Sequence, residues 1–166
     1  TWMAIEWIKS GKATMIGIAT GMVAGLATIT PASGTVGPAG AILIGFLAGF
    51  VCFYATQAVK SYFRIDDSLD VFPVHGVGGI LGIIMIAFVG NPDGFLGSGA
   101  AGISEEGAFA QLMIQLQGVV IICAYTAVVT YVILKLVSLI TDVRASNEDE
   151  DVGLDMSEHN EQGYSL

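Results

Sequence analysis

Four long stretches with almost no charge constrain this chain more than any other feature. Three contain no charged residue and the fourth has His75 as its only ionisable group; they cover residues 13–35, 38–59, 108–134 and 71–89. An α-helix rises ~1.5 Å per residue, so a helix of ~19 residues reaches ~28 Å, close to the ~30 Å of a bilayer's hydrocarbon core. Each stretch is therefore long enough to span a membrane.

The spans are predicted to be helices, because lipid offers no hydrogen-bond partner to an open strand edge. They are longer than the ~10 residues of a barrel strand, and they lack period-two alternation. A large soluble protein with buried helices is the alternative, and it needs polar faces to cover those helices. With a mean hydropathy of +0.73 and 13% charged residues, the chain is polar only in its loops and tail. The sequence favours an all-α, polytopic transmembrane helical bundle.

The basic residues predict how this bundle is oriented. Because successive spans alternate direction, all six fall on one face: Lys9, Lys12, Lys60, Arg64, Lys135 and Arg144. Lys and Arg are retained in cytoplasmic loops, so we expect that face to be cytoplasmic and the loops at residues 32–37 and 90–106 to lie outside. The predicted transmembrane domain covers residues 1–145, with the end of one helix and four complete spans. Residues 146–166 form a cytoplasmic acidic tail, too polar to build a core.

Small residues recur at a spacing of four within three of the spans. This spacing puts each set on one helix face, where missing side chains let helices approach closely. The set comprises Gly17, Gly21 and Gly25, then Ala41, Gly45 and Gly49, then Gly78 and Gly82, with Gly79 beside them. Tight helix packing explains these glycines, and a backbone that lines a narrow pathway is the alternative.

His75 is the one ionisable group well inside a predicted span. An intramembrane imidazole is costly unless it meets a partner or a water-filled cavity, so it is a candidate functional residue. Burial would disfavour the imidazolium cation and leave a neutral ring that both donates and accepts hydrogen bonds. Two alternatives stay open, namely a histidine satisfied by a neighbouring helix and a ligand of haem or chlorophyll.

Other polar residues near the spans have structural explanations. Asp67 and Asp70 are spaced like a capping box at the start of the helix that carries His75, where helix capping and the helix dipole account for both. Thr30 precedes Pro31 and is expected to return its hydroxyl to the backbone of the previous turn. Interhelical hydrogen bonding explains the glutamines of the last span, such as Gln111.

Three segments resemble the Amt/Rh family of ammonium transporters. GKATMIGIATGMVAGLATITPASG is similar to the family's eighth transmembrane helix, DDSLDVFPVHGVGGILG to its tenth, and GLDMSEHNEQGY to its cytoplasmic C-terminus. The resemblance implies an eleven-helix fold with inverted repeats, of which this chain is the C-terminal part. Residues 1–7 would end the seventh helix, and helices eight to eleven would be complete. A departure is Ala13, where the family usually has a helix-starting proline.

The resemblance also implies roles for individual residues. His75 matches the second of two histidines that share a hydrogen bond in a narrow apolar pore. Val71 matches a pore-wall position, Thr30 matches the threonine of the family's ITPA motif, and Asp67 matches a structural aspartate. The implied function is transport of ammonium or ammonia across the plasma membrane, without enzymatic activity and without a cofactor or metal.

The implied partners are the lipid bilayer, two further copies of the chain in a homotrimer and a cytosolic PII-type regulator at the tail; no nucleic acid is expected. A solvating disordered tail is the alternative to PII docking. Two other functions stay open, namely an ammonium sensor with the same fold and a cofactor-binding helical subunit of a redox complex.

Overall fold

The computed structural model describes residues 1–90 and 107–161, and every regular element in these two ranges is helical. The α-helices are α1 (Trp2–Ser10), α2 (Met15–Ile29), α3 (Pro38–Gln57), α4 (Gly78–Val89), α5 (Ala108–Val137), α6 (Asn147–Val152) and α7 (Leu154–His159). A 3₁₀ turn, η1 (Thr30–Ala32), continues α2. Two segments are π-helical. The first, η2 (Ala58–Tyr62), continues α3, and the second, η3 (Phe72–Val77), leads into α4.

Four helical segments are long and apolar enough to cross a bilayer: Met15–Ala32, Pro38–Tyr62, Phe72–Val89 and Ala108–Val137. The predicted all-α architecture with four spans is confirmed. The predicted outside loop at residues 90–106 lies, from residue 91 on, beyond the described residues.

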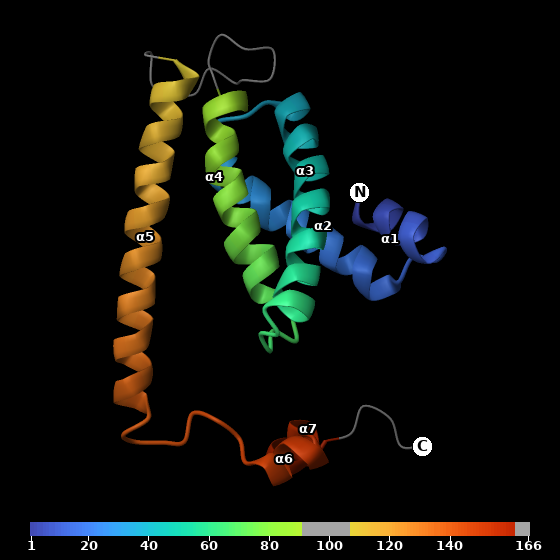
Figure 1. Cartoon of the computed structure of the whole chain (residues 1–166), viewed down its shortest axis with the longest axis vertical. Helices are drawn as coiled ribbons and strands as arrows, with labels where there is room; N and C mark the ends of the chain where they lie inside the picture. Colours follow the sequence, from blue (N-terminus) through green and yellow to red (C-terminus); the bar gives the residue numbers. More distant parts are fainter. Residues whose placement is uncertain (91–106, 162–166) are drawn as a thin grey trace. The chain divides into compact units, whose positions relative to one another are not determined.

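The chain divides into two compact units, Thr1–Val120 and Ile121–Leu166, and the boundary falls inside α5. In the first unit, α2 packs against both α3 and α4, as Figure 1 shows, and α1 contacts α2 and α3. The predicted division after residue 145 is based on polarity, because it separates membrane-spanning sequence from polar sequence. The boundary after Val120 is based on contacts within each compact unit, so the two need not coincide.

The helices of the first unit begin and end at residues suited to those positions. Gly11 ends α1 with a left-handed backbone (φ 72°), which glycine adopts without strain. The hydroxyl of Thr14 accepts a hydrogen bond from the backbone N–H of Gly17 at 2.9 Å and so caps α2. Pro38 occupies the first position of α3, where its missing N–H leaves no hydrogen bond unmade.

Close contact between α2 and α4 depends on missing side chains. A Cβ atom at Gly82 would overlap the backbone carbonyl oxygen of Thr28, and one at Gly78 would lie 2.7 Å from the Thr28 hydroxyl and 3.3 Å from Cys52 Sγ. Thr28 and Cys52 are themselves fully buried. The spanning helices α2 and α3 therefore approach α4 at two positions, Gly78 and Gly82, where any larger side chain would clash.

The other glycines predicted to pack fall into two groups. Gly17, Gly21 and Gly49 each face a residue of α1 or its N-cap, namely Glu6, Trp2 and Thr1. Gly25, Gly45 and Gly79 have no described atom within 4 Å of the position that a Cβ would occupy. Close helix approach within the described residues therefore involves five of the eight predicted glycines, which are Gly17, Gly21, Gly49, Gly78 and Gly82.

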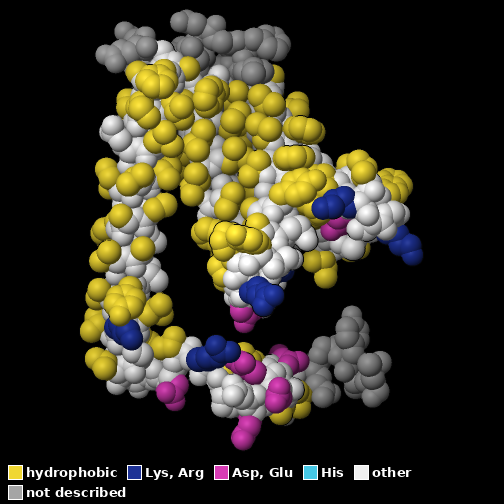
Figure 2. All heavy atoms as spheres, viewed as in Figure 1, with side chains coloured by type: hydrophobic (Ala, Val, Ile, Leu, Met, Phe, Trp, Pro, Cys, Tyr) yellow, Lys and Arg dark blue, Asp and Glu magenta, His cyan; other side chains and the backbone are white. Residues whose placement is uncertain are grey.

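Large hydrophobic side chains cover much of the outer surface of the first unit. Figure 2 shows them over the faces of α3 and α4 that this view presents, with charged side chains at the helix ends. Lys9 Nζ lies 5.3 Å from the ring centre of Phe53 and 5.0 Å from that of Tyr54, near the end of α3 that continues toward Lys60. Lys9 and Lys60 thus lie toward the same end of this unit.

The polar tail contains two short helices. Ser146 caps α6 by accepting a hydrogen bond from the Asp149 N–H at 3.1 Å. The guanidinium of Arg144 donates to both carboxylate oxygens of Glu150, at 3.2 and 3.3 Å. Gly153, with φ 96°, separates α6 from α7. None of the residues in these two helices is buried.

Candidate functional site

His75 lies in η3, the π-helical segment that begins the third membrane span. A π-helical turn is rare and is found frequently at functional sites, because it departs from the regular pattern of backbone hydrogen bonds. Pro73 and Val74 of the same segment are buried in the first unit, whereas His75 is exposed. The backbone of η3 is therefore anchored while the imidazole projects from it.

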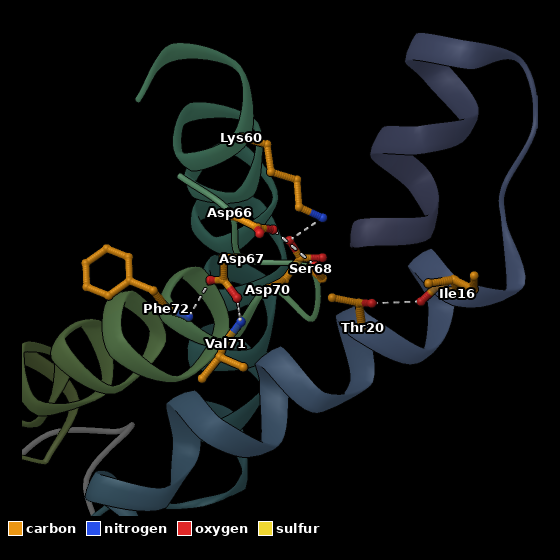
Figure 3. Close-up of polar contacts among 9 residues, drawn as sticks. All are labelled: Ile16, Thr20, Lys60, Asp66, Asp67, Ser68, Asp70, Val71 and Phe72. Carbon is orange, nitrogen blue, oxygen red and sulfur yellow. Dashed lines mark hydrogen bonds and ion pairs between the residues drawn. The ribbon is translucent and has the colours of Figure 1, made fainter. Parts of the chain in front are cut away.

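A groove of ≈ 260 Å³ adjoins the imidazole. Its lining comes from α2 on one side and from the region around η3 on the other: Ile16, Ala19, Thr20, Val23, Leu69, Val74 and His75. The Thr20 hydroxyl donates to the Ile16 carbonyl oxygen at 2.9 Å, within its own helix (Figure 3). His75 is the one ionisable residue of this lining, so the groove offers apolar walls and a single ring that can exchange hydrogen bonds with a small polar molecule.

The start of η3 is fixed by Asp67. One of its carboxylate oxygens accepts from the Val71 N–H and the other from the Phe72 N–H, each at 2.8 Å. Figure 3 shows this carboxylate facing the two backbone nitrogens. A carboxylate satisfies otherwise unpaired N–H groups at a helix start and interacts favourably with the helix dipole. The capping role predicted for Asp67 is present.

The capping role predicted for Asp70 is wrong. Its carboxylate forms an ion pair with Lys60 Nζ at 2.8 Å instead of bonding to backbone N–H groups (Figure 3). The backbone of Asp70 is left-handed (φ 56°) and directly precedes η3, so the cap is supplied three residues earlier by Asp67. Nearby, the Ser68 hydroxyl donates to Asp66 at 3.2 Å, so these two residues pair within the loop.

Thr30 and Val71 do not line the groove beside His75. The Thr30 hydroxyl donates to the Leu26 carbonyl oxygen at 2.7 Å, as expected where Pro31 interrupts α2. Val71 lies one turn before His75 and is 53% exposed. The described residues thus bring His75 to the groove, whereas Thr30 and Val71 lie outside its lining.

Three polar residues with structural contacts in the first unit were not singled out from the sequence. Lys60 was used only to orient the spans, and Thr20 carries no signal beyond its place in an apolar helix. Glu6 accepts hydrogen bonds from the Thr14 backbone N–H at 2.8 Å and from the Trp2 indole at 3.2 Å, which ties α1 to the start of α2. The sequence could have pointed to Glu6, because it is the one acidic residue among the first 65 positions.

In the described part of the chain, no three His, Cys, Asp or Glu side chains come together as metal ligands. The chain instead combines four membrane-spanning helices, a close glycine-mediated helix crossing and one imidazole beside an apolar groove. These features define a multi-pass α-helical membrane protein.

The chain belongs to the ammonium transporter family, because the sequence pattern described as "Ammonium Transporter Family" matches residues 1–164. This is a family of transporters rather than enzymes. An ammonium transporter of Aquifex aeolicus is 40% identical over 165 residues, and the ammonium transporter Amt1 of Archaeoglobus fulgidus is 42% identical over 165 residues. Each alignment covers 99% of this chain but only 38% and 40% of the respective relative. The chain thus spans about two fifths of the length of these relatives.

Solved structures agree with this assignment. The structure of Saccharomyces cerevisiae Mep2 is 35% identical, with a TM-score of 0.69 over 84% of this chain and 34% of Mep2. A structure described as a "Sensor Amt Protein" has a TM-score of 0.78 over 93% of this chain and 37% of its own, at 24% identity. The second likeness bears on the fold alone.

Proposed function

We propose that this chain is the C-terminal portion of a protein that carries ammonium or ammonia across the membrane, and that His75 lies on the substrate pathway. The observation that supports this most directly is the groove of ≈ 260 Å³, whose lining has one ionisable residue, His75, among mainly apolar side chains. In an apolar passage a neutral imidazole is a suitable partner for a small hydrogen-bonding molecule, because it both donates and accepts.

The physics of desolvation favours a particular order of steps. An unpaired cation in a hydrophobic constriction has a large desolvation cost, whereas neutral ammonia needs only a hydrogen-bond partner. Ammonium therefore loses a proton before the constriction, ammonia passes the imidazole of His75, and a proton is regained on the other side. Val71 and Thr30 belong to other parts of the same pathway, away from the groove at His75.

The complete protein, in this proposal, has eleven helices arranged as inverted repeats and assembles as a homotrimer in the plasma membrane. The side that holds Lys9 and Lys60 is cytoplasmic, as the retention of basic residues inside predicts. The transmembrane part extends through residue 145, and the acidic tail at 146–166 lies in the cytoplasm. There the tail docks a PII-type regulatory protein.

Uptake of radiolabelled methylammonium into proteoliposomes tests the role of His75. In the complete protein, His75→Ala removes a hydrogen bond that the substrate makes in the pore, and such a bond is worth ~1 to 3 kcal/mol. Uptake should fall roughly five- to hundredfold. The matched control is His159→Ala, which changes the chain's other histidine, on the exposed helix α7, and should leave uptake unchanged.

Two outcomes would contradict the proposal. A His75→Ala protein that assembles normally, transports at the wild-type rate and still excludes potassium would remove His75 from the pathway. A wild-type protein that binds methylammonium without accumulating it would be a sensor rather than a transporter.

A further inference from the structure

The loop between the second and third spans joins two π-helical ends. At the end of η2, the Phe63 N–H bonds to the Ala58 carbonyl oxygen at 2.9 Å and the Ile65 N–H to that of Val59 at 3.1 Å. Both bonds reach further back along the chain than the four residues of an α-helical bond, so the turn is wide. On the other side of the loop, η3 carries His75. Neither wide turn follows from the apolar pattern of the sequence.

The Lys60–Asp70 ion pair links these two ends. Lys60 belongs to η2, and Asp70 is two residues before the first residue of η3. The 2.8 Å contact between Nζ and Oδ1 therefore spans the loop, as Figure 3 shows. The Asp70 side chain is 15% exposed and that of Lys60 43%, so the contact is partly shielded from water.

The backbone at Asp70 has an uncommon conformation. Asp70 has φ 56°, a conformation that residues other than glycine adopt infrequently and that persists where surrounding contacts impose it. Its carbonyl oxygen accepts from the Val74 N–H at 3.0 Å, one residue before His75. The residue that pairs with Lys60 is thus left-handed, and its own carbonyl oxygen makes a backbone hydrogen bond into η3.

We propose that Lys60 and Asp70 form a positioning pair that sets the π-helical turn at His75 and so the direction of its imidazole into the groove. This inference rests on the proposed function of His75. Asp67 holds the first N–H groups of η3, and the ion pair holds the residue before them against η2. Neither Lys60 nor Asp70 lines the groove, so both act through His75.

The test uses the complete protein with three variants. Lys60→Met removes the charge and keeps the length of the side chain. Asp70→Asn removes the charge and keeps a residue type that tolerates a left-handed backbone. Lys60→Arg keeps the charge and is the conservative control. We expect methylammonium uptake to fall about three- to thirtyfold in the first two, as for a displaced reacting group. Uptake should stay near wild type in the third.

A double variant separates positioning from general damage. If Lys60 acts through His75, then Lys60→Met should have no further effect on uptake in a His75→Ala background, because the group that it positions is absent. Losses that multiply instead would overturn the inference. Assembly is followed by gel filtration. Failure of both Lys60→Met and Asp70→Asn to assemble would also count against it, because the pair would then hold the whole bundle.

A chemical readout makes the inference independent of transport. Diethyl pyrocarbonate modifies accessible imidazoles, and mass spectrometry of the peptide that contains His75 gives the rate. We expect Lys60→Met and Asp70→Asn to change this rate at least about threefold at His75 and to leave it unchanged at His159. An unchanged rate at His75 overturns the positioning role. A changed rate together with wild-type uptake by His75→Ala would keep the positioning role and refute the proposed function.

Discussion

At the scale of single residues, two aspartates three positions apart have different structural roles. Asp67 accepts two backbone hydrogen bonds at the start of η3, whereas Asp70 pairs with a lysine of the preceding span. The difference comes from the backbone, because Asp70 is left-handed and adjoins the helix, while Asp67 lies further back in the loop. Two identical side chains therefore stabilise the same helix start in different ways, one by capping its N–H groups and the other by an ion pair.

Asp67→Ala should destabilise the protein by ~1 kcal/mol, and by up to ~2 kcal/mol, because it removes the partner of two helix-start N–H groups. Thermal unfolding in detergent, followed by loss of the gel-filtration peak, measures this effect. Asp66→Ala is the control, since the Asp66 carboxylate accepts a hydrogen bond from the Ser68 hydroxyl rather than from the N–H groups at the start of η3. Equal destabilisation by both substitutions would show that loop polarity, rather than the cap, is responsible.

The sequence predicted the contacts of residues whose partners lie close to them along the chain. The Thr30 hydroxyl bonds four residues back, and Asp67 bonds four and five residues ahead, so the spacing alone indicates both contacts. The partner of Asp70 is ten residues away, across a loop whose path no local pattern specifies. Long-range pairing of this kind depends on where two helices end relative to each other, which periodicity does not encode.

At the scale of the helices, α2 and α4 approach until the backbone of one contacts the other. The position of Gly82 faces the Thr28 carbonyl group, a rigid neighbour that cannot rotate away as a flexible side chain can. Dispersion between closely packed backbones is a main source of association between helices in lipid. The spacing of glycines indicated such contacts, but the set predicted to pack also included Gly79, which lies in the same apolar run.

Gly82→Ala should therefore be more harmful than Gly79→Ala. The added methyl at Gly82 must displace backbone, and overpacking of this kind costs about 1 to 3 kcal/mol. At Gly79 the added Cβ meets no described atom within 4 Å. The yield of folded protein and its unfolding temperature in detergent measure the difference. Unfolding of Gly82→Ala at the wild-type temperature would mean that α2 and α4 are not held at this point.

The helices themselves were predictable because long apolar runs leave the backbone no alternative in lipid. The π-helical turns were not, because a single additional residue per turn leaves the apolar pattern almost unchanged. These turns adjoin the loop that positions His75. The sequence thus predicted the scaffold of the candidate site better than its local geometry.

At the scale of the whole molecule, the alternation of spans makes the orientation testable. Three exposed serines report on it: Ser33 after α2, Ser68 before η3 and Ser157 in α7. Each becomes cysteine in a background without Cys52 and Cys123. An impermeant maleimide added to intact cells should label Ser33→Cys and leave Ser68→Cys and Ser157→Cys protected. Labelling of Ser68→Cys with Ser33→Cys protected would reverse the orientation.

Docking of a cytosolic PII-type protein requires the same orientation. Removal of the chain after Asp151 deletes α7 and should abolish co-purification with that regulator, while the labelling pattern at Ser33 and Ser68 stays the same. Undiminished co-purification would leave the tail as a polar segment without a docking role.

Helix α5 contains 30 residues, of which Gln111 alone is buried. At ~1.5 Å per residue it is ~45 Å long, about half as long again as a hydrocarbon core of ~30 Å. Even a tilt of ~40°, the steepest common for such helices, leaves ~34 Å along the bilayer normal. Its uncharged stretch, residues 108–134, is ~40 Å long at ~1.5 Å per residue. The helix therefore has to tilt or extend beyond the hydrocarbon core, by an amount that depends on bilayer thickness and on packing against neighbouring helices. Lipid composition, which sets bilayer thickness, therefore affects where the segment that follows α5 lies relative to the membrane surface.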